Sequence, residues 1–134
     1  MAFTAITDRD ICVQEGTGAF KFIASGAILA GQAVEVVEGE YVIPTDSKPA
    51  NAFVGVADQT TSKGDAVAVY GPGNIVWGRA SGTSVGAGDL VVATVDGEFQ
   101  PANAVSGATD MQNAHGIALT TQGTTDGVVK IMLY

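Results

Sequence analysis

Ser84 is the residue of this chain whose surroundings most resemble a catalytic motif. The segment 82–86 reads Gly-Thr-Ser-Val-Gly, which fits the G-x-S-x-G pattern of serine hydrolases. In serine hydrolases a histidine accepts the proton of the serine, and His115 is the only histidine here. Three aspartates between these two residues are candidates for orienting the histidine: Asp89, Asp96 and Asp110.

The elements around Ser84 do not suit this chemistry. The hydrolase motif requires a strand before the serine and a helix directly after it. In this sequence the motif is followed by turn residues at 87–89 and then by an apolar run that predicts a strand. The chain of 134 residues is also too short for such a sheet with its covering helices. A small serine hydrolase that uses Ser84 and His115 is therefore the least favoured of three functional hypotheses.

No other group of residues predicts a catalytic, metal or cofactor site. His115 has no cluster of cysteines or carboxylates near it in the sequence, as a metal site would need. Asp8 and Asp10 are spaced like the start of a calcium loop, but the glycine and the distal glutamate of such a loop are missing. The sequence also lacks the glycine patterns that cradle nucleotide phosphates. We expect a protein that is not an enzyme and that binds no metal ion and no cofactor.

The charge pattern argues against several classes of partner. The chain carries 14 acidic and 6 basic residues, which gives a formal net charge of −8. The basic residues are scattered, so they form no stripe that could neutralise a nucleic-acid backbone. No apolar run approaches the roughly 20 residues of a membrane helix, and the start of the chain does not resemble a signal peptide. We expect a protein made in a cytoplasm, without a direct nucleic-acid or membrane partner.

The sequence contains the same pattern twice. An Ala-Gly pair opens each copy, at Ala30-Gly31 and at Ala87-Gly88, and a proline follows thirteen residues after each glycine. Each copy also has a Gly-Glu-aromatic turn, a predicted strand with an internal glycine, and a tyrosine at its end. The two units span about residues 28–70 and 85–134. This repeat predicts a fold built from two similar tandem pieces.

The body of the chain consists of predicted strands. Alternating or β-branched apolar residues occupy eight short runs: 33–37, 41–43, 53–57, 66–70, 74–80, 90–95, 116–120 and 128–134. The segment 71–74 predicts a hairpin turn, and 103–113 suits a short helical turn or a loop. Gly55 and Gly116 lie inside strands, which indicates a bulge or a close crossing of two backbones. We predict an all-β domain that forms a compact sandwich or squat barrel of short strands.

Residues 1–19 differ from the repeat. They carry charged residues on both sides of the short apolar run 11–13, and they end in Gly-Thr-Gly at 16–18. We interpret them as an N-terminal arm with one short strand and a flexible joint, followed by a single β domain over 20–134. Deletion of residues 1–15 is expected to leave this domain folded.

The turns and strands together resemble a known family. The runs that carry the resemblance are 53–57, 63–69, 85–91, 115–118 and 128–133, and the similarity covers roughly residues 26–134. Their pattern resembles the small capsid decoration (cement) proteins of tailed double-stranded-DNA viruses. The resemblance implies a homotrimer that binds the outside of an icosahedral head and clamps neighbouring major capsid subunits. It also implies that the N-terminal arm can add a strand to a capsid sheet.

The favoured hypothesis is a structural virion protein, made in the host cytoplasm, that lies on the outer capsid surface and stabilises contacts between major capsid subunits. The second hypothesis is another virion or surface β-module, such as a tail, fibre or glycan-binding domain, in which Trp77 would be the sugar platform. Under the first hypothesis the predicted capsid or subunit contacts lie in the arm and in the hairpin: Ile11, Val13, Pro72 and Trp77.

Overall fold

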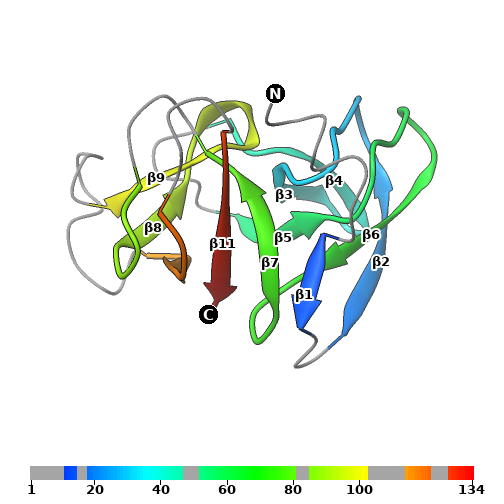
Figure 1. Cartoon of the computed structure of the whole chain (residues 1–134). Coiled ribbons are helices and arrows are strands. Elements are labelled where there is room, and N and C mark those ends of the chain that lie inside the picture. The colour runs from blue at the N-terminus through cyan, green and yellow to red at the C-terminus, as the bar shows by residue number, and fades with distance from the viewer. Residues whose placement is uncertain (1–10, 15–17, 47–51, 81–84, 103–113, 122–126) are drawn as a thin grey trace.

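The computed structural model describes residues 11–14, 18–46, 52–80, 85–102, 114–121 and 127–134, and nearly all of its regular structure is β. The elements in chain order are β1 (Cys12–Gln14), β2 (Ala19–Ala24), β3 (Ala33–Glu38), β4 (Tyr41–Pro44), β5 (Phe53–Ala57), β6 (Ala66–Tyr70), β7 (Ile75–Arg79), β8 (Leu90–Ala93), the short 3-10 turn η1 (Val95–Gly97), β9 (Phe99–Pro101), β10 (Gly116–Ala118) and β11 (Val128–Leu133). Strands β2 to β6 close into a barrel, and the others form a six-stranded sheet. Figure 1 shows the barrel strands beside and behind this sheet, with β7 and β11 in front. The predicted compact all-β fold is confirmed.

The barrel and the second sheet share one internal topology. Around the barrel the order is β2-β4-β3-β5-β6, and every pair is antiparallel except β2 with β4. In the second sheet the order β9-β8-β10-β11-β7 repeats this arrangement, and a parallel bridge between Ala80 and Phe99 joins the segment after β7 to β9. The two similar tandem pieces are therefore present, and each includes the strand before the sequence repeat. We call β2–β6 unit 1 and β7–β11 unit 2.

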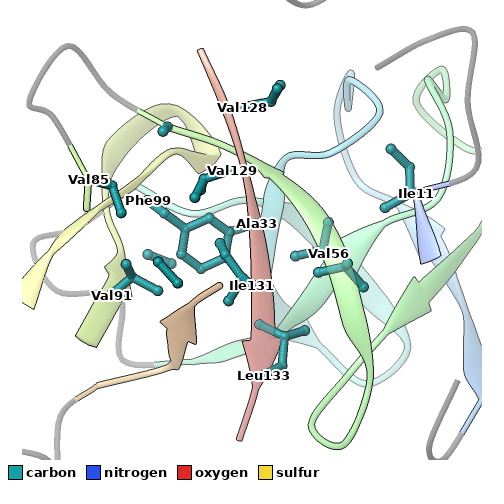
Figure 2. Packing of buried hydrophobic residues seen from close by; sticks show 14 of the residues in the cluster. Ile11, Ala33, Val56, Val85, Val91, Phe99, Val128, Val129, Ile131 and Leu133 are labelled. Atoms are coloured by element: carbon teal, nitrogen blue, oxygen red, sulfur yellow. The ribbon is translucent and has the colours of Figure 1, made fainter. Parts of the chain in front are cut away.

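The largest cluster of buried side chains lies between the two units. Unit 2 contributes Phe99 and Ile131, among others, and unit 1 contributes Ala33 and Val56 from the outer wall of its barrel. Figure 2 shows the Phe99 ring in the middle of this cluster, with Ile131 next to it. Phe53 of β5 packs edge-on against Phe99, with ring centroids 6.0 Å apart. The interior of unit 2 is thus completed by the wall of unit 1, which binds the two units into one core.

The turn between β8 and β9 fastens unit 2 to unit 1 through hydrogen bonds. Asp96 and Gly97 have φ values of 61° and 67°, the left-handed conformation that a type I′ hairpin turn requires. The Gly97 N–H donates to the Thr45 carbonyl at 3.2 Å, and the Gln32 side-chain amide donates to the Asp96 carbonyl at 2.8 Å. The Thr45 hydroxyl donates to the carbonyl of Thr94. Because the Gln32 and Thr45 side chains are buried, these bonds favour one relative geometry of the two units.

Arg79, at the end of β7, forms a second link between the units. Its side chain is buried, and its Nε donates to the carbonyl of Ala30 at 2.7 Å. Its backbone N–H donates to the carbonyl of Gly31 at 3.0 Å. Burial lowers the pKa of Arg79, and the negative charge of Glu98 raises it in part. The guanidinium thus holds the loop before β3 of unit 1 against β7 of unit 2.

Two glutamates make the stability of the fold depend on pH. Burial raises the pKa of Glu98, and the Asp96 carboxylate raises it further, while Arg79 lowers it. Burial and the carboxylate of Asp46 likewise raise the pKa of Glu35. A raised folded-state pKa means that the folded chain keeps a proton which the unfolded chain has already released. The resulting stabilisation is therefore complete below the unfolded pKa of about 4.3 and is lost as the pH rises through the folded pKa.

We expect the melting temperature to fall as the pH rises from about 4.5 to about 7. The fall should be smaller in the double variant Glu35→Gln/Glu98→Gln, because the two shifted groups are then absent. The control variant Glu38→Gln/Glu40→Gln removes the same total charge at two exposed positions and should keep the original slope. Differential scanning calorimetry across this pH range checks the prediction. Equal slopes in the two double variants would assign the pH dependence to net charge alone.

Candidate docking surface

The outer side of the second sheet carries a continuous row of apolar side chains. Ile75 pairs with Met132, Met132 with Ile117, and Ile117 with Leu90, so the row crosses β7, β11, β10 and β8 in register. The residues next to them along these strands point into the core, and side chains on a strand alternate between its two faces. None of the four row side chains is buried. The row is therefore a partly accessible apolar surface on the wall of unit 2, most exposed at Met132 and most covered at Leu90, which packs against Val92 and Ala102.

A second row lies beside the first and contains the only tryptophan of the chain. Trp77 of β7 pairs with Lys130 of β11, and the Lys130 amine lies 5.3 Å from the centroid of the indole ring. At this distance the cation–π attraction contributes about 0.5–1 kcal/mol at an exposed site. Leu119 extends the row, because its N–H donates to the Lys130 carbonyl at 2.8 Å and its side chain is exposed. The two rows together form what we call the outer face: Ile75, Trp77, Leu90, Ile117, Leu119, Lys130 and Met132.

The outer face differs in charge from the rest of this acidic chain. No carboxylate is present among the outward-pointing residues of the described strands β7, β8, β10 and β11. Lys130 is partly exposed there, whereas Arg79 is buried against unit 1. By contrast, the β3–β4 hairpin carries Glu35, Glu38 and Glu40. A contiguous, partly exposed apolar face without carboxylates is typical of a surface that binds another protein.

The four predicted contact residues occupy different surroundings. Trp77 lies on the outer face, where it is half-buried and also packs against the core between the units. Pro72 is exposed in the β6–β7 turn, which the Asn74 side chain closes by donating to the Gly71 carbonyl at 2.9 Å. Val13 lies in β1, whose backbone pairs with β7. Ile11 is fully buried in the core between the units, and its carbonyl accepts the Trp77 N–H at 2.8 Å. The structure therefore gives the Ile11 side chain a core position, where the sequence predicted a contact with a partner.

The other residues of the outer face were missed by the sequence analysis. Strand alternation shows that side chains point to two faces, but it does not tell which face is covered. In β11 the sequence Val-Val-Lys-Ile-Met-Leu is largely apolar on both faces, and this two-sided apolar character is the one signal that could have revealed a second contact surface. Ile75 and Ile117 were also missed, because their partners across the sheet come from distant parts of the chain.

The residues that could have formed a catalytic triad have structural contacts where the structure describes them. Ser84 and Asp110 lie outside the described residues. His115 stacks on the ring of Phe53, with centroids 4.4 Å apart, and its Nδ1 accepts the Ala93 N–H at 2.9 Å. The carboxylate of Asp89 accepts the N–H of Gly86 at 2.8 Å within a turn.

The described residues also contain no group of three His, Cys, Asp or Glu side chains placed to hold a metal ion. None of them belongs to a helix that could span a bilayer.

Comparison with solved structures finds proteins of similar fold. No family model matches the sequence, and no curated protein matches it either. Among solved structures, the chain is similar to the crystal structure of the N base of head fiber gp8.5 in bacteriophage phi29, with a TM-score of 0.64 and 19% sequence identity. The alignment covers 87% of this chain and 92% of the phage protein. At this identity the likeness establishes the fold that the two chains share.

Proposed function

We propose that this chain is a structural protein of a tailed-phage virion. It attaches to the outer surface of the icosahedral head and stabilises contacts between major capsid subunits. The observation that carries the proposal is the likeness to the head-fiber base of phage phi29, which extends over nearly the whole of both chains. The resemblance of the sequence to capsid decoration proteins also supports a place on the head. It rests on the turn and strand residues of this chain and not on the structural comparison.

The chemistry of the described surface supports a binding role without catalysis. The outer face offers apolar side chains and one cation to another protein chain, and the core between the units supports this face from behind. His115, the only histidine, contributes its Nδ1 to a backbone hydrogen bond. The scattered basic residues provide no stripe for DNA. We propose the major capsid protein as the partner on the head. We also propose that this chain is not an enzyme and binds neither nucleic acid nor a membrane.

Three copies of the chain are proposed to sit together at each three-fold or quasi-three-fold position of the head. A trimer engages several capsid subunits at once, so weak individual contacts add up through their high effective concentration. The glycan-binding alternative receives less support, since the Lys130 amine lies over the Trp77 ring where a sugar would stack. A hydrolase that uses Ser84 receives less support because His115 is engaged with Phe53 and Ala93.

The proposal is tested by co-sedimentation of the purified chain with heads that lack it. We expect saturable binding near three copies per three-fold position, and we expect the decorated heads to resist heating better than the bare ones. Absence of binding to heads of the parent phage would refute the proposal, and a glycan screen would then test the second hypothesis.

A pair of truncations separates the N-terminal arm from the folded body. Deletion of residues 1–10 should leave the melting temperature unchanged and weaken attachment to heads, because Ile11 and β1 remain in place. Deletion of residues 1–15 should lower stability as well, because it removes Ile11, whose burial is worth about 2–5 kcal/mol. Ile11→Ala in the full chain is the matched control, which loses stability but keeps the arm. Unchanged attachment after deletion of 1–10 would exclude a role of the arm in binding.

A further inference from the structure

The outer face of unit 2 has a counterpart in unit 1 that is covered within the chain. The matching row of unit 1 runs through the corresponding strands as Ala19, Tyr70, Val56 and Ala33. Val56 and Ala33 are fully buried between the units, and Tyr70 packs against the same cluster. The β8–β9 turn lies at the Ala33 end of this row, so close that a Cβ added at Gly97 would lie 2.9 Å from the Ala33 carbonyl oxygen. Within the chain, the hairpin turn of unit 2 therefore already lies against the apolar row of unit 1.

The corresponding row of unit 2 is more apolar and less covered. Its Leu90 end packs against the small cluster of Val92 and Ala102, whereas Met132 stays exposed. Where unit 1 has alanine at both ends, unit 2 has Ile75 and Leu90, and Met132 in the middle is 41% exposed. Small residues suit a wall that is packed closely within the chain. Larger apolar residues on an exposed wall enlarge the surface that a partner can remove from water.

The β3–β4 hairpin turn of unit 1 is exposed, whereas the β8–β9 turn of unit 2 is packed against unit 1. Its residues Gly39-Glu40-Tyr41 correspond in sequence to Gly97-Glu98-Phe99, but they lie on the surface. Val37 is 52% exposed and Tyr41 is 44% exposed, whereas Phe99 is fully buried. Glu38 and Glu40 lie between Val37 and Tyr41 in the sequence and are also exposed. We call Val37–Tyr41 the hairpin tip, and it offers two exposed apolar side chains together with two exposed carboxylates.

We propose that the hairpin tip of one copy of this chain docks on the outer face of unit 2 of a second copy. Val37 and Tyr41 contact the apolar row, and Glu38 and Glu40 lie opposite Lys130. The attraction between these charges favours this pairing over face-to-face contact, which would bring two Lys130 side chains together. This contact between two copies resembles a contact inside the chain, in which the turn η1 lies against β3 and β4.

The proposed contact is heterologous, since the tip and the outer face are different patches. Each copy therefore uses one tip and one face, and repetition of the contact closes a ring if the rotation between copies allows it. A ring of three copies fits the three-fold position of the head. The number three rests on the proposed function, whereas the contact itself does not. The contact itself can be tested with the free chain in the absence of heads.

Sedimentation velocity of the full chain over a range of concentrations tests the contact. We expect concentration-dependent association of the original chain. Val37→Glu on the tip and Met132→Glu on the outer face should each weaken association at least tenfold. Leu29→Glu is the matched control, because Leu29 is 46% exposed outside both patches and should tolerate the same change without effect. Thermal melting of every variant verifies that the fold is intact.

A mixture of the two variants distinguishes the head-to-tail contact from the alternatives. The Val37→Glu chain keeps an intact outer face and the Met132→Glu chain keeps an intact tip, so the mixture should form a one-to-one dimer that neither variant forms alone. Lys130→Glu should weaken association, and adding Glu38→Lys and Glu40→Lys to that chain should restore it. Three results would overturn the proposal: a monomer at every concentration, association that is insensitive to Val37→Glu, or a mixture that stays monomeric. Association into a species other than a trimer would leave the contact in place and contradict the three-fold seating.

Discussion

Replacement of Arg79 by methionine should lower the free energy of unfolding by about 3 kcal/mol or more. The guanidinium is buried where the units meet, and its Nε donates to the Ala30 carbonyl at 2.7 Å. Methionine fills a similar volume but donates no hydrogen bond, so the Ala30 carbonyl and the Glu98 carboxylate both lose a buried partner. Equilibrium denaturation in urea, followed by tryptophan fluorescence, measures the loss. Because Trp77 lies in unit 2, this signal also reports whether unit 2 loosens before the barrel.

Lys63→Met is the control for Arg79→Met, because it removes one positive charge from an exposed position and should change stability by less than about 0.5 kcal/mol. Arg79→Lys keeps the charge but loses the fixed geometry of the guanidinium, so its stability should lie between the two. A loss below about 1 kcal/mol in Arg79→Met would mean that the apolar core alone holds the units together.

The tandem architecture could be predicted from the sequence because its signals are local. Turns that need glycine, and prolines that end strands, recur at the same spacing in both units. The first strand of each unit was not recognised as part of the repeat. The tripeptide Ala-Ser-Gly at 24–26 and again at 80–82 marks both strands, but its spacing to the next repeated glycine differs by one residue. The closure of each unit by a parallel contact depends on long-range pairing, for which the sequence holds no local signal.

The candidate surface was only partly predictable for the same physical reason. Pro72 and Trp77 could be singled out because a turn and a large aromatic are visible in the sequence. The burial of Ile11 could not, because it follows from the pairing of Cys12 with Val76, two residues far apart in the chain. The outer face depends on which side of the second sheet is covered by unit 1, and this is a property of the assembled core. Sequence patterns therefore indicated the strands, whereas the surface emerged only from their arrangement.

Gly55→Ala should destabilise the fold by about 3 kcal/mol or more, which is a decrease of roughly 10 °C in melting temperature for a domain of this size. The side chain of an alanine at this position would overlap the Tyr70 carbonyl and would lie 2.7 Å from a methyl carbon of Val69. The carbonyl belongs to the backbone of β6 and cannot rotate away, so β5 and β6 must separate. This separation also displaces Val56, which forms the wall against which unit 2 packs. Thermal unfolding followed by circular dichroism measures the effect.

Two other glycines test the explanation for Gly55: one at the equivalent position of unit 2 and one that has room for a side chain. Gly116 is the equivalent position in unit 2, and a Cβ there would lie 2.7 Å from the Met132 carbonyl oxygen, so Gly116→Ala should be similarly harmful. Gly26 is the control, because a Cβ there would have an ordinary contact of 3.8 Å with Ile43, and Gly26→Ala should change stability by about 0.5 kcal/mol or less. If all three variants melted together, the close backbone crossing of β5 and β6 would not be what requires glycine. If only the first two melt early, the internal glycine of each unit is required because one strand crosses its neighbour without room for a side chain.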